Sequence, residues 1–431
     1  MSVAYGGIVA FAFRGGNVLL ALATVVLTSN QLGPEGRGTF VLGITAVGIV
    51  NAVMGGLTAA IAYQVSNQRR EPGAALLHGG AVAGTLSALA VVAGITAMAA
   101  LNGDAADLSL SVGVSAAAVI VMSAIAGVYL GNGALVRYNL ALVAPPLFSL
   151  VGIALTILVL DRHTPAPALA AYAVGQWLAV LALLAAGAAR MVRGVHFEQA
   201  LVKAMARFAV VAGVASGVSY LNYRADVFVV EHFEGKEGVA LYANAVYIGE
   251  SVWQLSGSLA LATYARIGAL DRAAAAELTA RVMRHTLLIL GVVCTVLFAV
   301  SGVLVDLLFD REFAGTASAV RFLLPGTLIY GLAASFSAFY TYQRGQPWAS
   351  AVIAGAGLAI DLGLDFVLVP RMGVDGAALA SAIAYSSAMV GGLAVFVRSE
   401  HLRPSRVFLF GAEDVADYRA LLGRLRTAMG R

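Results

Sequence analysis

Charged side chains inside long apolar stretches are the first candidates for chemistry in this sequence. Arg14 lies in an apolar stretch over residues 7–29, beside Gly15, Gly16 and Asn17. A charge at membrane depth costs free energy, so it normally faces water or a partner. The arginine guanidinium stays charged and presents a fork of donors that fits phosphate oxygens. We interpret Arg14 and Asn17 as candidate anion-binding residues; the alternative is an arginine that extends to the lipid headgroups and binds nothing.

A second polar group falls in the apolar stretch over residues 207–230. It contains Asn222, Arg224 and Asp226. In a helix, residues two apart point to different faces, so Arg224 and Asp226 do not pair well with each other. We expect Asn222 and Arg224 to contact a ligand and Asp226 to carry a proton or a sodium ion. The alternative is structural pairing with other helices.

Three further carboxylates lie within apolar stretches, namely Glu250, Asp361 and Asp365. Burial favours the protonated form of a lone carboxyl group, so Glu250 is a candidate proton carrier. Asp361 and Asp365 are four residues apart and share one helix face, where like charges favour a shared proton or a bound cation. The alternatives are a Glu250 carboxyl hydrogen-bonded to a neighbouring helix and an aspartate pair that only lines water.

The composition places the chain in a membrane. Of its 431 residues, 60% are hydrophobic and only 12% are charged, whereas soluble domains carry about 25% charged residues. No basic stripe with interleaved aromatic residues indicates nucleic acid. The single cysteine, Cys294, excludes an internal disulfide and a multi-cysteine metal site. The six histidines are not spaced like metal ligands. No P-loop, nucleophile elbow or dinucleotide-binding motif appears in the sequence. We therefore expect that the protein is not an enzyme and needs no cofactor beyond a coupling proton or sodium ion.

Apolar stretches of about 20 residues are long enough to cross a bilayer. The sequence predicts an all-α membrane protein with twelve such helices. They cover residues 7–29, 38–62, 74–100, 109–131, 139–160, 167–189, 207–230, 239–264, 286–306, 318–342, 347–369 and 376–397.

The positive charges predict the orientation of these helices. If the N-terminus is cytoplasmic, the cytoplasmic connections and the C-terminal tail hold 19 of the 27 lysines and arginines. The external connections hold six, and Arg14 and Arg224 lie within helices. An excess of positive charge on the cytoplasmic side is the usual rule, so both termini are predicted to be cytoplasmic.

The chain also contains an internal repeat. A shift of 202 positions places Gly235-Lys236-Glu237-Gly238 on Gly33-Pro34-Glu35-Gly36, and it places Tyr242 on Phe40. The stretch 32–38 contains three glycines and a proline, which predicts a turn between two helices. Because each half has six helices, the halves are parallel repeats, related by a pseudo-two-fold axis along the membrane normal.

The repeat predicts four segments. These are an N-terminal six-helix lobe over 1–189, a cytoplasmic linker over 190–206, a C-terminal six-helix lobe over 207–397 and a cytoplasmic tail over 398–431. Within the tail, residues 411–431 have apolar residues at helical spacing and predict an amphipathic helix. Such a helix either lies on the lipid surface or is simply solvated.

Three loops resemble those of polysaccharide-export flippases, which belong to the multidrug/oligosaccharidyl-lipid/polysaccharide (MOP) superfamily. The turn Gly33-Pro34-Glu35-Gly36-Arg37-Gly38 is similar to the LGPEGFG turn after the first helix of these proteins. The stretch from Asp310 to Gly315, followed by Leu323-Leu324-Pro325-Gly326, resembles their F-G-x-x-F loop and the helix after it. The segment 369–378, from Val369-Pro370 to Ala377-Ala378, resembles their turn before the twelfth helix. The resemblance covers nearly the whole chain in order.

The resemblance implies a transporter of lipid-linked sugar. The substrate would be an undecaprenyl-pyrophosphate oligosaccharide, moved across the bacterial cytoplasmic membrane by alternating access. A cavity arginine that holds the pyrophosphate would correspond to Arg14 and, less directly, Arg224. Membrane lipids would surround the protein, and a polysaccharide polymerase or glycosyltransferase would be its partner.

Two alternatives stay open at this point. A cation-coupled multidrug antiporter of the same superfamily would use an acidic cavity, for which the membrane carboxylates are candidates. A scaffold for polysaccharide synthesis enzymes would have no reason to keep charges within its helices.

Overall fold

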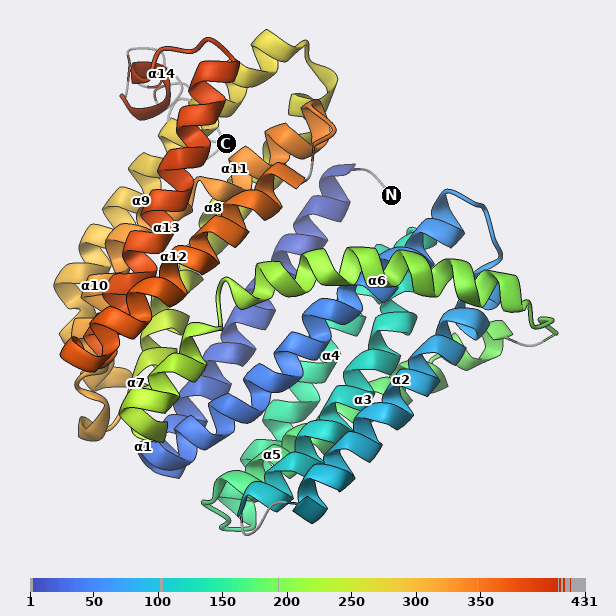
Figure 1. The fold of residues 1–431 in the computed structure, drawn as a ribbon. Helices are drawn as coiled ribbons and strands as arrows, with labels where there is room; N and C mark the ends of the chain where they lie inside the picture. Colours follow the sequence, from blue (N-terminus) through green and yellow to red (C-terminus); the bar gives the residue numbers. More distant parts are fainter. Residues whose placement is uncertain are drawn as a thin grey trace, which may run out of the picture. The chain divides into compact units, whose positions relative to one another are not determined.

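The computed structural model describes residues 3–100, 104–192, 194–346, 348–409, 411, 414 and 419. The described part of the chain is helical apart from turns and short connections, and no strand occurs in it (Figure 1). The predicted all-α fold is therefore confirmed. The predicted amphipathic helix over 411–431 lies almost entirely outside the described residues.

One glycine in each repeat has the same positive φ angle and follows the first predicted helix of that repeat. Helix α1 (Val3–Ser66) has a single non-helical residue, Gly33, with φ of 66°. Helix α7 (Asp226–Ser251) has a single non-helical residue, Gly235, also with φ of 66°. A positive φ is open to glycine without steric cost. These positions are 202 residues apart, as the sequence repeat predicts, although the break is confined to Gly33 and does not extend over the whole stretch 32–38.

The remaining helices of the first half pack around α1. They are α2 (Pro72–Ala100), α3 (Asp104–Gly131), α4 (Leu135–Ala154), α5 (Pro165–Ala185) and α6 (Gln199–Leu221). Helix α3 packs against α1, α2 and α5, while α6 packs along α1. A Cβ atom on Gly56 would lie 2.2 Å from the carbonyl oxygen of Ala209, so only glycine allows this close approach of α1 and α6.

The second half contains helices of 15 to 37 residues and two short helices, α11 and α14. They are α8 (Trp253–Ala269), α9 (Arg272–Leu308), α10 (Thr316–Tyr330), α11 (Ala333–Ala338), α12 (Trp348–Met372), α13 (Val374–Ser399) and α14 (Ser405–Phe408). Helix α13 packs against α10 and α12. The chain separates into two compact units, 1–244 with 305–315 and 245–304 with 316–431. The lobe boundaries inferred from the sequence repeat stay a prediction.

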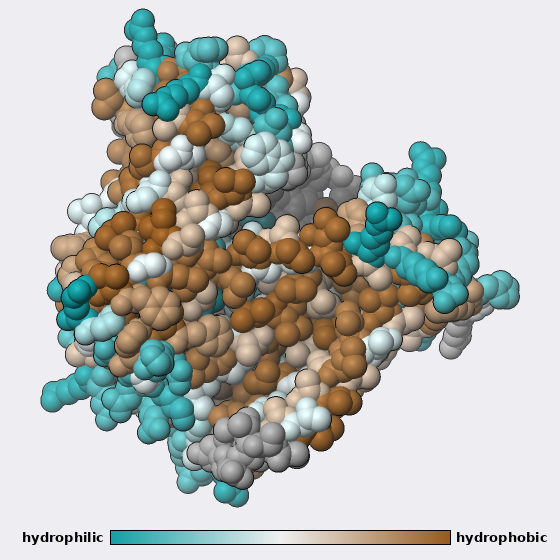
Figure 2. Space-filling model, viewed as in Figure 1, coloured by the Kyte–Doolittle hydropathy of each residue, from teal (hydrophilic) through white to brown (hydrophobic). Residues whose placement is uncertain are grey.

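Ten helical segments of the described chain are long and apolar enough to cross a membrane. One of them, in α1, contains two predicted spans joined at Gly33. On α6, Val210, Val211 and Val214 are 65%, 72% and 59% exposed. Figure 2 shows hydrophobic residues over this helix and hydrophilic residues gathered near helix ends. An exposed apolar surface of this kind is suited to lipid, and the protein is a multi-pass membrane protein.

Three of the predicted helices are interrupted. The sequence predicts one helix over 207–230, but α6 ends at Leu221 and α7 begins at Asp226. The stretch 239–264 breaks at Val252, and the stretch 318–342 breaks between α10 and α11. Hydrophobicity predicts that a segment enters the membrane, but it does not distinguish a continuous helix from a broken one whose freed backbone groups find other partners.

Candidate functional site

Arg14 lies on α1 with free space beside it. Its side chain is exposed, and it makes no hydrogen bond or ion pair with any residue that the structure describes. A Cβ atom built on Gly15 or Gly16 would meet no other atom within 4 Å. Asn17, half-buried, has a buried side-chain oxygen without a hydrogen-bond partner. Arg14 is therefore accessible on a segment with room around it, whereas Asn17 is only partly exposed.

Asn222 and Arg224 lie in a turn between two helices, not inside a helix as predicted. Asn222 is buried, and the half-buried Arg224 donates a hydrogen bond to the carbonyl oxygen of Tyr223. Non-helical backbone at membrane depth is tolerated where it is buried in protein or lines water. A broken helix also exposes backbone groups that bind ions in transporters.

Asp226 is the first residue of α7 and not a mid-helix residue. Its carboxylate accepts a hydrogen bond from the backbone N–H of Val227 at 2.8 Å and another from the Tyr242 hydroxyl group. The side chain is only 1% exposed. A helix N-terminus stabilises negative charge, so this position suits an ionised carboxylate.

Arg37 forms a buried cluster that the sequence did not predict, since Arg37 falls in a predicted external connection. The side chain is 3% exposed. Its guanidinium donates to Thr28 Oγ1 at 3.0 Å and to Asn244 Oδ1 at 3.4 Å, and Asn244 in turn donates to Ser29 Oγ at 2.9 Å. Both partners of Arg37 are neutral, and within the described residues no carboxylate forms an ion pair with it. The only sequence signal was an arginine placed between two glycines of the turn.

The two glycine breaks also meet in space. A Cβ atom on Gly38 would lie 1.8 Å from the carbonyl oxygen of Lys236, so the helical segment after Gly33 packs directly on the backbone after Gly235. Nearby, Asn30 donates to the carbonyl oxygen of Leu308 at 3.0 Å, which ties the end of α9 to α1. Three segments that the sequence places at external connections are thus joined in one unit.

Glu250 belongs to an aromatic cluster in the second unit. Its carboxylate accepts a hydrogen bond from the Tyr385 hydroxyl at 3.0 Å. The rings of Trp253, Tyr330 and Tyr385 lie with centroids 5.0–5.5 Å apart. This arrangement matches the hydrogen-bonded alternative for Glu250 and leaves a proton-carrying role a prediction.

Asp361 and Asp365 lie on one face of α12, as their spacing predicts. They are 2% and 0% exposed. The packing of α12 on α13 buries this face. Two carboxyl groups buried this fully are costly as charges unless a proton or cation accompanies them. Their role in ion coupling stays a prediction.

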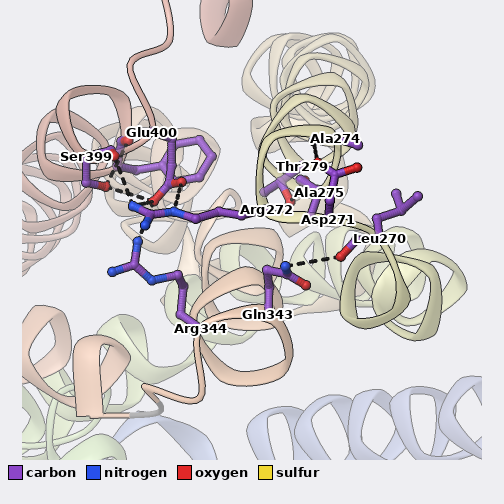
Figure 3. Close-up of polar contacts among 11 residues, drawn as sticks. Leu270, Asp271, Arg272, Ala274, Ala275, Thr279, Gln343, Arg344, Ser399 and Glu400 are labelled. Atoms are coloured by element: carbon purple, nitrogen blue, oxygen red, sulfur yellow. Dashed lines mark hydrogen bonds and ion pairs between the residues drawn. The ribbon is translucent and has the colours of Figure 1, made fainter.

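Another buried carboxylate, that of Glu400, ties three helix ends together (Figure 3). Arg272 at the start of α9 donates to it at 2.7 and 3.2 Å, and Arg344 donates at 2.8 Å. The carboxylate is 2% exposed. Burial alone would raise the pKa of Glu400, but hydrogen bonds from Arg272 and Ser399 and the nearby arginine charges hold that pKa below its ordinary value.

A similar pair fixes the start of the tail. Arg284 donates to both carboxylate oxygens of Asp414, at 2.9 and 3.0 Å, and to the carbonyl oxygen of Arg406. The backbone N–H of Gly411 donates to Asp414 at 2.8 Å. Burial opposes ionisation, but these bonds and the charge of Arg284 lower the pKa of Asp414. Both networks hold helix ends together, and they use Arg272, Arg284 and Arg344, which the sequence predicts to be cytoplasmic.

No family model matches the sequence, and no curated protein matches it. Solved structures do match. A MATE-family multidrug resistance transporter of the MOP superfamily, inward-facing, aligns with a TM-score of 0.73 and 17% identity over 89% of this chain and 94% of its own. The lipid II flippase MurJ, in an inward closed conformation, aligns with a TM-score of 0.71 and 14% identity over 94% of this chain and 89% of its own.

The chain has the fold of the MOP transporters. A third match, a MOP superfamily transporter from Pyrococcus furiosus, has a TM-score of 0.62 and 18% identity over 92% of this chain and 94% of its own. That transporter is described as having a binding pocket of reversed polarity, which suggests a different function for it. The predicted fold of twelve helices in two lobes is confirmed, and these neighbours are transporters. Likeness at these identities shows the fold alone.

Proposed function

We propose that this protein is a flippase that moves a lipid-linked oligosaccharide, carried on undecaprenyl pyrophosphate, across the bacterial cytoplasmic membrane by alternating access. The observation that carries the proposal is the accessible guanidinium of Arg14 on a membrane helix, beside open space at Gly15 and Gly16. A pyrophosphate and its sugars cannot cross hydrocarbon unaided, because their polar groups would lose water without compensation. Arg14 supplies fixed positive charge and Asn17 a hydrogen-bonding amide, while Asn222 and Arg224 offer further contacts from a break between helices.

The carboxylates supply the proposed coupling. Asp361 and Asp365 would share a proton or hold a sodium ion, and Asp226 and Glu250 are further candidates. Both termini would lie in the cytoplasm. A glycosyltransferase or polymerase partner would supply the lipid-linked glycan or receive it after transport. The name of MurJ, a lipid II flippase, agrees with a lipid-linked substrate.

A second candidate function is a cation-coupled multidrug antiporter, as the names of the MATE neighbours suggest. The buried pair Asp361 and Asp365 favours it, since buried carboxylates select cations. An accessible Arg14 opposes it, because a fixed positive charge repels organic cations.

The test uses proteoliposomes that contain a fluorescent undecaprenyl-pyrophosphate oligosaccharide and an external, membrane-impermeant quencher. We expect protein-dependent quenching that is lost in Arg14→Ala and kept in Arg162→Ala, a matched arginine on an exposed connection. Insertion and folding of both variants are checked by gel filtration. An active Arg14→Ala protein would remove the main substrate contact, and gradient-driven uptake of a cationic dye without quenching would select the antiporter.

A further inference from the structure

The first unit contains a cavity of about 410 Å³ that none of the site residues above lines. It lies between the second part of α1 and helices α3, α4 and α5. Pockets of 300–1,000 Å³ are the usual size for small-ligand sites. Within the part of the chain that the structure describes, no charged side chain lines this cavity. A strongly charged ligand would therefore lose its hydration without a compensating partner.

Polar groups nevertheless converge on the cavity. Its lining includes the carboxamides of Asn51 and Gln176 and the phenol groups of Tyr138 and Tyr172. The Gln176 amide nitrogen donates to Ser149 Oγ at 3.3 Å, which orients the carboxamide. The side-chain polar atoms of Asn51 and Tyr138 make no hydrogen bond with a described residue, so they are available to a ligand.

The two prolines of α4 belong to the same wall. Pro145 and Pro146 have no N–H, so the carbonyl oxygens of Ala141 and Leu142 cannot receive the helix hydrogen bond from four residues ahead. All four residues line the cavity. Helix α4 continues through both prolines.

We infer that this cavity binds a neutral, hexose-sized sugar unit, an inference that rests on the proposed function and assigns this part of the substrate to the N-terminal helices. A sugar ring presents hydroxyl groups that both donate and accept, and its apolar C–H faces stack on aromatic rings. Carboxamides donate and accept hydrogen bonds, and tyrosines do so while their rings offer an aromatic face. An apolar drug would need fewer polar groups, and a metal cation would favour carboxylates.

The test measures saturation-transfer NMR between the purified protein and free methyl glycosides of glucose, galactose, mannose and N-acetylglucosamine. The protein is held in nanodiscs, because the headgroup of a maltoside detergent is itself a sugar. We expect transfer to at least one glycoside, weakened at least about ten-fold in Asn51→Leu with Gln176→Leu, since each lost hydrogen bond is worth about 1 kcal/mol.

A matched control carries the same two changes elsewhere in the unit. Asn132→Leu with Gln68→Leu replaces exposed residues outside the cavity and should leave binding unchanged. Tyr138→Phe keeps the ring and should weaken binding only a few-fold, which guards against a cavity variant that fails to fold.

Absence of transfer from all four glycosides, or equal transfer in the cavity double variant, overturns the inference. The flipping assay does not enter this measurement. Sugar binding without lipid exposure would therefore reject the proposed function and keep the cavity assignment, whereas lipid exposure without sugar binding would do the reverse.

Discussion

At the scale of single residues, charged side chains within the helices lie in three different environments. Arg14 is exposed and has no described partner, Arg37 is buried among neutral hydrogen-bond acceptors, and Asp361 and Asp365 are buried together. Only the first is available to an anion without rearrangement. Arg37 instead donates hydrogen bonds to Thr28 and Asn244, which links α1 to α7. The aspartate pair is the best candidate for an ion.

The aspartate pair carries a prediction about energy coupling. In Asp361→Asn with Asp365→Asn, we expect stimulation of transport by a proton or sodium gradient to be lost. One cation per cycle is worth about 2.3 kcal/mol per 100 mV, which corresponds to about fifty-fold in accumulation. The measurement is transport in proteoliposomes with and without an imposed gradient.

The chain offers a control with the same spacing. Asp306 and Asp310 are also four residues apart but are exposed, so Asp306→Asn with Asp310→Asn should keep the gradient response. Unchanged gradient dependence in the buried double variant would assign coupling to other groups.

At the scale of elements, close contacts between helices depend on glycine. Gly38 allows the second part of α1 to touch the backbone of Lys236 on α7. Gly326, next to Pro325, allows α10 to approach α13, where a Cβ atom would lie 2.3 Å from Cα of Ala382. Small residues let membrane helices pack at short range, where dispersion attraction replaces the missing hydrophobic driving force.

Gly38→Ala should therefore destabilise the protein. The new Cβ meets backbone, which cannot move like a flexible side chain, so we expect a loss of about 1–3 kcal/mol. Gly84→Ala on α2 is the control, because a Cβ there meets nothing within 4 Å and alanine favours the helix. Thermal unfolding in detergent measures the stability of both variants. An equal shift in Tm for the two variants would contradict the close contact between Gly38 and the backbone of Lys236.

The Glu400 network predicts a pH effect at the ends of α9 and α13. Its pKa is lower folded than unfolded, so the stabilisation is fully present above the unfolded pKa of about 4.3 and is lost as pH falls through the folded value. Glu400→Gln should lower stability at pH 7 by about 1.5–3 kcal/mol, the worth of charged hydrogen bonds.

The difference in Tm between wild type and Glu400→Gln should shrink as the pH falls below the unfolded pKa and through the folded pKa of Glu400. Thermal unfolding at a series of pH values measures it. A constant difference across the series would show that ionisation of Glu400 does not stabilise the folded protein.

At the scale of the whole molecule, orientation in the membrane is the main prediction. In a Cys294→Ser background, a single cysteine is introduced either by Gln68→Cys or by Arg162→Cys, both at exposed positions. An impermeant maleimide applied to intact spheroplasts should label Arg162→Cys only, and permeabilised cells should label both. Labelling of Gln68→Cys in intact spheroplasts would show that the predicted topology is inverted.

The sequence alone determined the membrane class, the approximate spans and the glycine repeat. These are local properties: a span needs only length and apolar composition, and a positive φ needs only glycine. Tertiary structure decided what the polar residues do. The break at 222–225, the burial of Arg37, the place of Glu400 between Arg272 and Arg344, and the uncharged cavity between α1 and α3 to α5 all depend on partners distant in the chain. Hydropathy assigns each type of polar residue one fixed cost of burial. The actual cost depends on the groups that the fold brings within hydrogen-bonding distance.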